Sequence, residues 1–292
     1  MMKLAISAQA LAHLPLEKAC EVLCRHDVRY IELWPENLPW VGAEGISWSY
    51  VGRDLAHTKD ILARAGILPA CVTFSGAFVE ALRDDPVRYS AELCAAIQAA
   101  HALGARIVNH YCYYLAPEKP DFARLTAFWA EAATLARELG VTLALENEAH
   151  DATAHPDGTR AILDGMKLPA LGTNFDAANY YHGSSEAFPL GYLRLRDKIA
   201  YIHVKNACQY VNGLGYLPRR AGAEMGGVFA PQKIYYPLCC AGAVNIDGLL
   251  TMAAADGYDG FVTLEPHVPA EDLDKYYTAD LAYLRGRHNF ER

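Results

Sequence analysis

The sequence predicts an α/β fold, a single (β/α)8 TIM barrel over residues 1–292 with long βα loops after strands 2 and 7. Eight short aliphatic runs alternate with amphipathic segments, glycines mark the joints, and 292 residues suit one such barrel. A doubly wound open sheet is the alternative. Because no G-x-G-x-x-G motif follows the first run, the barrel is favoured and no nucleotide cofactor is expected.

The expected strands are short runs rich in β-branched and aliphatic residues. In chain order they are Lys3–Ala8, Val28–Leu33, Ile67–Thr73, Ala105–His110, Val141–Glu146, Leu171–Asp176, Ile199–Val204 and Gly260–Glu265. Eight strands are the number that closes this type of barrel.

The segments between the strands carry apolar residues at helical spacing. Clear examples are Leu16, Ala19, Cys20 and Leu23; Leu93, Ile97 and Ala100; and Leu125, Phe128, Trp129 and Ala132. Gly66, Gly104, Gly140 and Gly257 follow helical segments and precede strands. Glycine tolerates the left-handed backbone of a helix C-cap, so each of these glycines predicts a helix end.

Two of the expected connections are unusually long. One follows the second strand, from Trp34 to Gly52, and the other follows the seventh, from Asn206 to about Val244. Both belong to the face of the barrel that carries active sites. Loops of this length cover a site or form a subunit interface, and we expect a homo-oligomer, a dimer or a tetramer.

Composition excludes several classes of protein. The chain is 52% hydrophobic, too apolar for a disordered protein, and its formal net charge of −8 disfavours nucleic acid and anionic membranes as partners. No run approaches the ~18 apolar residues of a membrane span. The eight cysteines form no C-x-x-C pair. Reduced thiols in the cytoplasm are therefore expected.

Charged side chains stand at the ends of the last four expected strands. These strands deliver Glu146, Asp176, His203 and Glu265 to the same rim of the barrel. Carboxylates at the ends of apolar strands are costly unless they are paired or bind a cation. Three carboxylates and one imidazole form a ligand set for one divalent ion; we expect Mn²⁺, with Mg²⁺, Co²⁺ or Zn²⁺ as alternatives.

Four motifs in this order resemble the xylose isomerase-like TIM-barrel superfamily, in its sugar phosphate isomerase/epimerase branch. They are Ala144-Leu145-Glu146-Asn147, Asn174-Phe175-Asp176, Tyr201-Ile202-His203-Val204-Lys205 and the segment from Asp256 to Glu265. In tagatose 3-epimerase-like members, two glutamates bind the metal and exchange protons with opposite faces of a sugar carbon. The resemblance implies these catalytic roles for Glu146 and Glu265, and metal-ligand roles for Asp176 and His203.

The chain departs from the epimerase pattern at two positions that hold substrate hydroxyls in that branch. Asn179 stands where a histidine is usual, and Gln209 stands where an arginine is usual. The endonuclease IV-like DNA-repair branch also needs a histidine at position 179 and further histidine and aspartate ligands after the seventh strand. Its three-zinc site is therefore not expected.

Other polar and aromatic residues near these strand ends are candidates for substrate binding. They are Lys205, His110, Asn179, Glu32 and Trp34. Glu148, His150, His182 and His267 lie just beyond the ligand strands and are candidate partners of the ligands.

These residues favour a metal-dependent isomerase or epimerase that acts on a small-molecule sugar or polyol. A cation bound to a substrate carbonyl and an adjacent hydroxylate acidifies the C–H bond between them by stabilising an enediolate. One carboxylate then acts as general base and a second returns the proton. The alternative is a lyase with the same metal and glutamate pair, similar to inosose dehydratases or to enzymes that cleave 3-keto C-glycosides. A sugar-binding barrel without catalysis is disfavoured because all four ligands are present.

Overall fold

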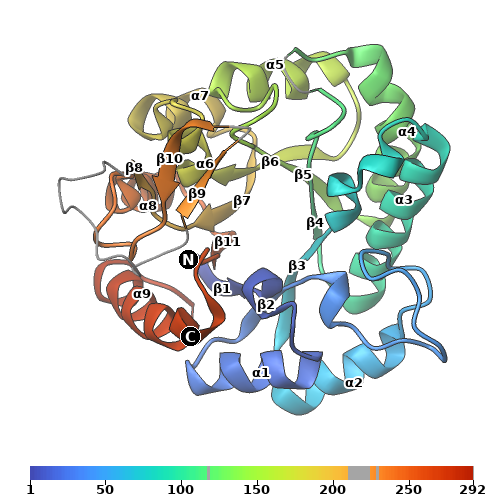
Figure 1. Ribbon diagram of the computed structural model, residues 1–292, viewed down its shortest axis with the longest axis horizontal. Coiled ribbons are helices and arrows are strands. Elements are labelled where there is room, and N and C mark those ends of the chain that lie inside the picture. The colour runs from blue at the N-terminus through green and yellow to red at the C-terminus, as the bar shows by residue number, and fades with distance from the viewer. Residues whose placement is uncertain (117–118, 210–223, 228–229, 292) are drawn as a thin grey trace.

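The computed structural model describes residues 1–116, 119–209, 224–227 and 230–291. Eight parallel strands close into a barrel in the order β1-β11-β7-β6-β5-β4-β3-β2 (Figure 1), so the predicted (β/α)8 barrel is confirmed. The strands are β1 (Lys3–Ser7), β2 (Tyr30–Leu33), β3 (Leu68–Thr73), β4 (Ile107–His110), β5 (Thr142–Glu146), β6 (Leu171–Asp176), β7 (Ile199–Val204) and β11 (Phe261–Leu264).

The helices form an outer ring around these strands (Figure 1). They are α1 (Leu16–Arg25), α2 (Leu55–Ala65), α3 (Pro86–Leu103), α4 (Phe122–Leu139), α5 (Pro156–Met166), α6 (Ala177–His182), α7 (Tyr192–Leu195), α8 (Ile246–Ala255) and α9 (Leu273–Arg287). All four glycines predicted to end helices, Gly66, Gly104, Gly140 and Gly257, have the left-handed backbone that glycine favours.

Side chains alternate between the two faces of each strand. A small apolar cluster that includes Ala5, Ile107, Ala144 and Tyr201 comes from strands around the barrel and fills its interior. The larger core lies between the strands and the helices, with Trp129 of α4 fully buried in it. This alternation decides which residue at each strand end faces the barrel axis.

The connection after β7 differs from the irregular loop expected there. In its described part it contains a second sheet in the order β8-β10-β9, made of β8 (Cys208–Gln209), β9 (Glu224–Gly227) and β10 (Ala230–Tyr235). Its strands pair antiparallel and so satisfy backbone groups that a loop would leave to water. Residues 210–223 and 228–229 of the expected loop lie outside the described residues.

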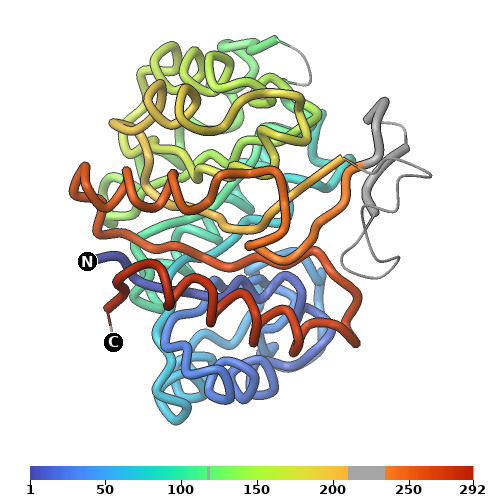
Figure 2. The backbone as a smooth tube through the Cα atoms, turned by 90° about the vertical axis from the view of Figure 1, so that its left-hand side faces the viewer, coloured from blue at the N-terminus to red at the C-terminus, as the bar shows by residue number. Residues whose placement is uncertain are grey.

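Figure 2 shows both chain ends on the same side of the molecule. The first strand begins at Lys3 near this side, and Glu291 donates its backbone N–H to the Met2 carbonyl oxygen at 2.8 Å. The carboxyl ends of the barrel strands lie at the opposite end. Among the helices of the described ranges, none has the length and apolar character to cross a membrane.

Candidate metal centre

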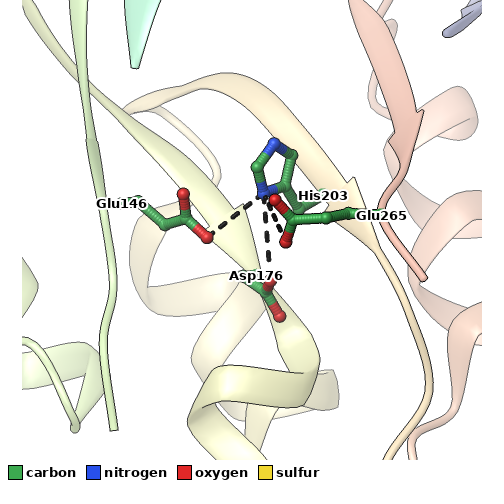
Figure 3. A group of neighbouring side chains, drawn as sticks. All are labelled: Glu146, Asp176, His203 and Glu265. Atoms are coloured by element: carbon green, nitrogen blue, oxygen red, sulfur yellow. Dashed lines mark hydrogen bonds and ion pairs between the residues drawn. The ribbon is translucent and has the colours of Figure 1, made fainter. Parts of the chain in front are cut away.

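The structure brings Glu146, Asp176, His203 and Glu265 together at the carboxyl ends of four neighbouring strands (Figure 3). Each offers one ligand atom, and these atoms all lie within 4.8 Å of one another. His203 Nδ1 is at the centre, 3.1 Å from Glu146 Oε1, 3.3 Å from Glu265 Oε2 and 4.0 Å from Asp176 Oδ2. This spacing suits a cation whose ligands sit at about 2.0–2.2 Å from it.

Strand register places these side chains side by side. Asp176 pairs with His203 across β6 and β7, and Glu146 pairs with Asn174 across β5 and β6. Asp176 also begins helix α6, because its Oδ1 accepts the backbone N–H of Asn179 at 2.9 Å. This leaves Oδ2 directed toward the other ligands.

The four ligands are buried, none more than 2% exposed, so their negative charge needs partners inside the protein. Lys205 supplies one. It is itself 4% exposed, and its Nζ donates to Glu265 Oε2 at 2.6 Å and to Asp176 Oδ2. Burial disfavours the ammonium, but the charges of Asp176 and Glu265 outweigh it and raise the Lys205 pKa well above its usual value.

Glu265 is held in its charged form by the same cations. Burial alone would raise its pKa, but His203 and Lys205 outweigh burial, and the pKa of the Glu265 carboxyl lies well below its usual value. The His203 pKa moves the opposite way. Burial opposes the imidazolium, yet Glu265, Glu32 and Glu146 raise the His203 pKa well above its usual value.

Glu32 lies behind His203. Its Oε2 is 2.6 Å from His203 Nε2, the ring nitrogen that faces away from the ligand group. Its Oε1 accepts hydrogen bonds from Thr73 Oγ1 at 2.7 Å, Trp34 Nε1 at 3.0 Å and Ser7 Oγ at 3.1 Å. Glu32 is fully buried and held by these hydrogen bonds, so its contact with Nε2 fixes the orientation of the His203 ring. Trp34, a candidate for substrate binding, has only 6% of its surface exposed and is a hydrogen-bond partner of Glu32.

Three amides hold Glu146. Asn109 and Asn174 donate to its Oε2 at 2.6 and 3.2 Å, and Asn179 lies 3.4 Å from its Oε1. The structure thus brings Asn179 into the site, as a contact of a ligand. Sequence reasoning missed Asn109 and Asn174. Period-two alternation counted from Asp176 identifies Asn174 as facing inward, whereas β4 carries no ligand from which to count to Asn109.

His110 does not join this group. Its neighbour Asn109 faces the barrel axis, so His110 faces the helices, and its ring meets Trp129 edge to face with centroids 4.9 Å apart. It is fully buried, and burial lowers its pKa to about 3. The expectation that His110 contacts substrate is corrected by this orientation. Gln209 also lies outside the group, on an exposed part of β8.

Four residues just beyond the ligand strands lie near the site. His267 Nε2 is 3.4 Å from Glu265 Oε2, and its ring packs on Tyr236. The rings of His150 and His182 meet edge to face at 4.9 Å. Glu148 is half-buried near Glu146 and Asp151, and desolvation together with these two charges raises its pKa well above its usual value.

The donor set fits a divalent metal ion. Oxygen ligands with one imidazole suit Mn²⁺, Mg²⁺, Co²⁺ or Zn²⁺. Glu32 accepts from one ring nitrogen of His203 and so leaves the other, Nδ1, to face the carboxylates. A carboxylate behind a ligand histidine is the usual arrangement in metal sites.

Solved structures with the same fold span almost the whole chain. The D-allulose 3-epimerase from Methylomonas sp. in complex with D-allulose has a TM-score of 0.68 and 16% identity, over 98% of this chain and 97% of that one. The probable 3-DHS dehydratase AsbF from Bacillus anthracis has a TM-score of 0.67 and 15% identity, over 98% and 100%. The IOLI protein with a binding zinc atom has a TM-score of 0.68 and 15% identity, over 99% and 100%.

These identities show a shared fold and leave the reaction open. No curated protein matches the chain. A family model described as "Xylose isomerase-like TIM barrel" matches residues 20–287. With the closed eight-stranded barrel and the grouped carboxylates and histidine, this match shows that the chain belongs to the xylose isomerase-like TIM barrel family.

Proposed function

We propose that this protein is a metal-dependent enzyme that isomerises or epimerises a sugar or polyol by proton transfer through an enediolate. The observation that carries the proposal is the placement of Glu146 and Glu265 on either side of His203, 3.1 and 3.3 Å from its Nδ1. Glu146 ends β5 and Glu265 directly follows β11, with β6 and β7 between these two strands. A substrate carbon between the two carboxylates would meet one on each side.

Glu146, Asp176, His203 and Glu265 would hold the ion. A divalent ion there supplies the acidification of a C–H bond next to a carbonyl, which side-chain bases alone achieve poorly. One glutamate then removes the proton and the other returns it, to the neighbouring carbon in an isomerase or to the opposite face in an epimerase. The burial of both carboxylates excludes water that would compete for the proton.

The two glutamates have different partners. Amide groups of Asn109 and Asn174 hold Glu146, whereas Glu265 lies beside the ammonium of Lys205 and the ring of His203. This asymmetry supports two different roles in one reaction, because a base and an acid need different proton affinities. The Lys205 ammonium also provides a donor for a substrate oxygen at this side of the site.

A dehydratase is the second candidate, and Lys205 is the observation that favours it. Elimination begins with the same removal of a proton and ends with loss of a hydroxyl, which needs an acid next to the leaving oxygen. The glutamate that has taken up the substrate proton would be this acid, and the buried ammonium of Lys205, 2.6 Å from Glu265 Oε2, would donate a hydrogen bond to the leaving oxygen. The probable 3-DHS dehydratase AsbF has the same fold as this chain, which is compatible with this alternative.

The test is proton NMR of ketoses, aldoses, inososes and 3-keto-glycosides incubated in D₂O with the Mn²⁺-loaded protein. We expect deuterium at a carbon next to the carbonyl, with an isomer or epimer as product. Loss of water or of an aglycone would identify the lyase. The same substrates are then run with Glu265→Gln and Glu146→Gln, and with Glu138→Gln on the exposed face of α4 as the matched control.

Either active-site change should reduce exchange at least about 100-fold, the usual contribution of a general acid or base. Glu138→Gln should match the wild type. Metal analysis of Asp176→Ala complements this test, because loss of a ligand should abolish stoichiometric Mn²⁺ uptake. Full exchange in Glu265→Gln, or unchanged uptake in Asp176→Ala, would contradict the proposal.

A further inference from the structure

We propose that Lys205 is a built-in competitor for the metal: its ammonium and a divalent ion use the same oxygens of Asp176 and Glu265, so that binding of the ion releases Lys205 toward the substrate. This inference rests on the proposed metal-dependent function and concerns how the site is filled. Lys205 is thus a positioning residue that sets metal affinity, and metal occupancy determines where its ammonium lies.

The contacts of Lys205 involve the ligand oxygens themselves. Its Nζ donates to Glu265 Oε2 at 2.6 Å, and this is the oxygen that lies 3.3 Å from His203 Nδ1. It also donates to Asp176 Oδ2, the oxygen that faces His203. Lys205 therefore binds the side of each carboxylate on which the ligand atoms converge.

Asp176 has no second oxygen to offer. Its Oδ1 accepts the backbone N–H of Asn179 at 2.9 Å and begins helix α6. If Oδ1 turned toward a metal ion, the helix would lose its N-cap, which costs about 1 kcal/mol. Direct ligation by Asp176 therefore uses Oδ2, which Lys205 occupies.

Charge balance favours exchange between the two cations. Glu146, Asp176 and Glu265 carry three negative charges in a space where their ligand atoms lie within 4.8 Å, and Lys205 is the ammonium that contacts two of them. A divalent ion on the same oxygens would face this ammonium at close range in a buried site, where repulsion is strong. Lys205 lies just after β7, and the rotatable bonds of its four-carbon side chain allow the ammonium to change direction without a change in the backbone.

The test compares metal affinity in Lys205→Met, Lys205→Arg and the wild type by calorimetric titration with Mn²⁺ and Zn²⁺ after removal of metal with a chelator. Methionine keeps the length of the side chain and removes its charge, so we expect about 10- to 100-fold tighter binding, the size of effect that partners of metal ligands have. Arginine keeps the charge and should leave the affinity close to that of the wild type. Lys198→Met, which removes a half-exposed lysine 3.6 Å from Asp164, is the matched control and should change nothing.

A second measurement follows the ammonium in the unmodified protein. With ¹⁵N-labelled lysine, the resonance of Lys205, assigned by its absence from Lys205→Arg, should shift when Zn²⁺ is added and should do so with a one-to-one end point. A resonance that stays in place at saturating Zn²⁺ would overturn the inference, whether or not Lys205→Met folds.

The outcomes separate the inference from the function on which it rests. If the wild type binds metal and Lys205→Met binds it no more tightly, the metal-dependent function stands and the competition is wrong. If only Lys205→Met binds metal, the competition is supported and the wild type works without a metal, contrary to the proposed function. If neither binds metal, both proposals fail.

Discussion

Glu32 and His203 show how a fully buried carboxylate can orient a candidate metal ligand. His203 has two ring nitrogens, and only one can face the ligands. The Glu32 carboxylate, 2.6 Å from Nε2, accepts a hydrogen bond from the N–H at that nitrogen, which would leave Nδ1 as the lone-pair donor to a metal. Thr73, Trp34 and Ser7 hold Glu32 in turn.

Glu32→Gln should weaken metal binding about 10- to 100-fold with the fold intact. The remaining amide oxygen keeps the hydrogen bonds from Thr73 and Trp34, but its NH₂ group faces His203 Nε2 and favours the tautomer that protonates Nδ1. Titration calorimetry with Zn²⁺ measures the affinity. Glu36→Gln, a change of the same kind at a carboxylate bound to Ser75, is the control. Equal affinities for wild type and Glu32→Gln would contradict the role of Glu32.

Asp151 should make stability depend on pH. It is 5% exposed, and burial raises its pKa from 3.8 to about 6. The folded state therefore holds this proton more tightly than the unfolded chain, and the free energy of unfolding falls as pH rises from about 4 to about 6. In Asp151→Asn this contribution, at most about 3 kcal/mol, should disappear.

Urea unfolding at pH 4.5, 5.5 and 7 measures the Asp151 effect. The amide oxygen of asparagine can still accept from Thr153 N and Oγ1, which lie 2.7 and 2.6 Å from Asp151 Oδ1, so the loop should keep its conformation. Asp60→Asn, at an exposed position, should follow the wild-type curve. The idea fails if Asp151→Asn has the same pH dependence as the wild type.

At the scale of elements, the left-handed backbone at a glycine that ends a helix would strain any other residue, and this strain can be measured separately from side-chain contacts. Gly66 ends α2 with φ of 68°, and a Cβ there would meet no atom within 4 Å. Gly66→Ala should therefore destabilise the protein by backbone strain alone, about 1–2 kcal/mol. Gly286 lies within α9, also in open space, and Gly286→Ala should stabilise by about 0.5–1 kcal/mol.

Chemical denaturation of both variants measures whether the two changes in the free energy of unfolding have opposite signs. The same atoms are added in each case, in the same absence of neighbours, so a difference in sign isolates the left-handed backbone as its cause. If both changes shift the free energy of unfolding in the same direction, strain at the C-cap of α2 is not the reason that glycine stands there.

Sequence patterns predicted the barrel strands and helices because each needs only local information, a run of aliphatic residues or a helical period. They failed where the face of a strand mattered. In β4, Val108 and His110 face the helices, whereas Ile107 and Asn109 face the barrel axis. Each face carries one apolar and one polar residue, so the hydrophobic pattern does not show which face is which. The sheet β8-β10-β9 was also missed, because its pairing joins distant segments of one loop.

At the scale of the whole molecule, the four candidate metal ligands come from neighbouring strands on one side of the barrel. The four residues were predictable as a group because parallel strands in a closed barrel must end on one rim. Lys205 and Glu32 were also predicted to lie near the site, but the hydrogen bonds that join them to these ligands depend on side-chain directions that a sequence does not specify. The ligands belong to β5, β6 and β7 and to the residue after β11, strands adjacent in the order β11-β7-β6-β5.

Because the ligands come from strands that are far apart in the chain, a metal ion should bind the folded barrel and not the unfolded protein. Binding then stabilises by mass action, about 2.7 kcal/mol at a free ion concentration 100 times the Kd. For a chain of this size, that free energy corresponds to a rise in Tm of about 4 °C. Calorimetric scans with Mn²⁺ and with excess chelator measure the shift, and Asp176→Ala should show none. A wild-type Tm that is the same under both conditions would mean that the four side chains hold no ion, and that Lys205 and His203 alone balance the buried carboxylates.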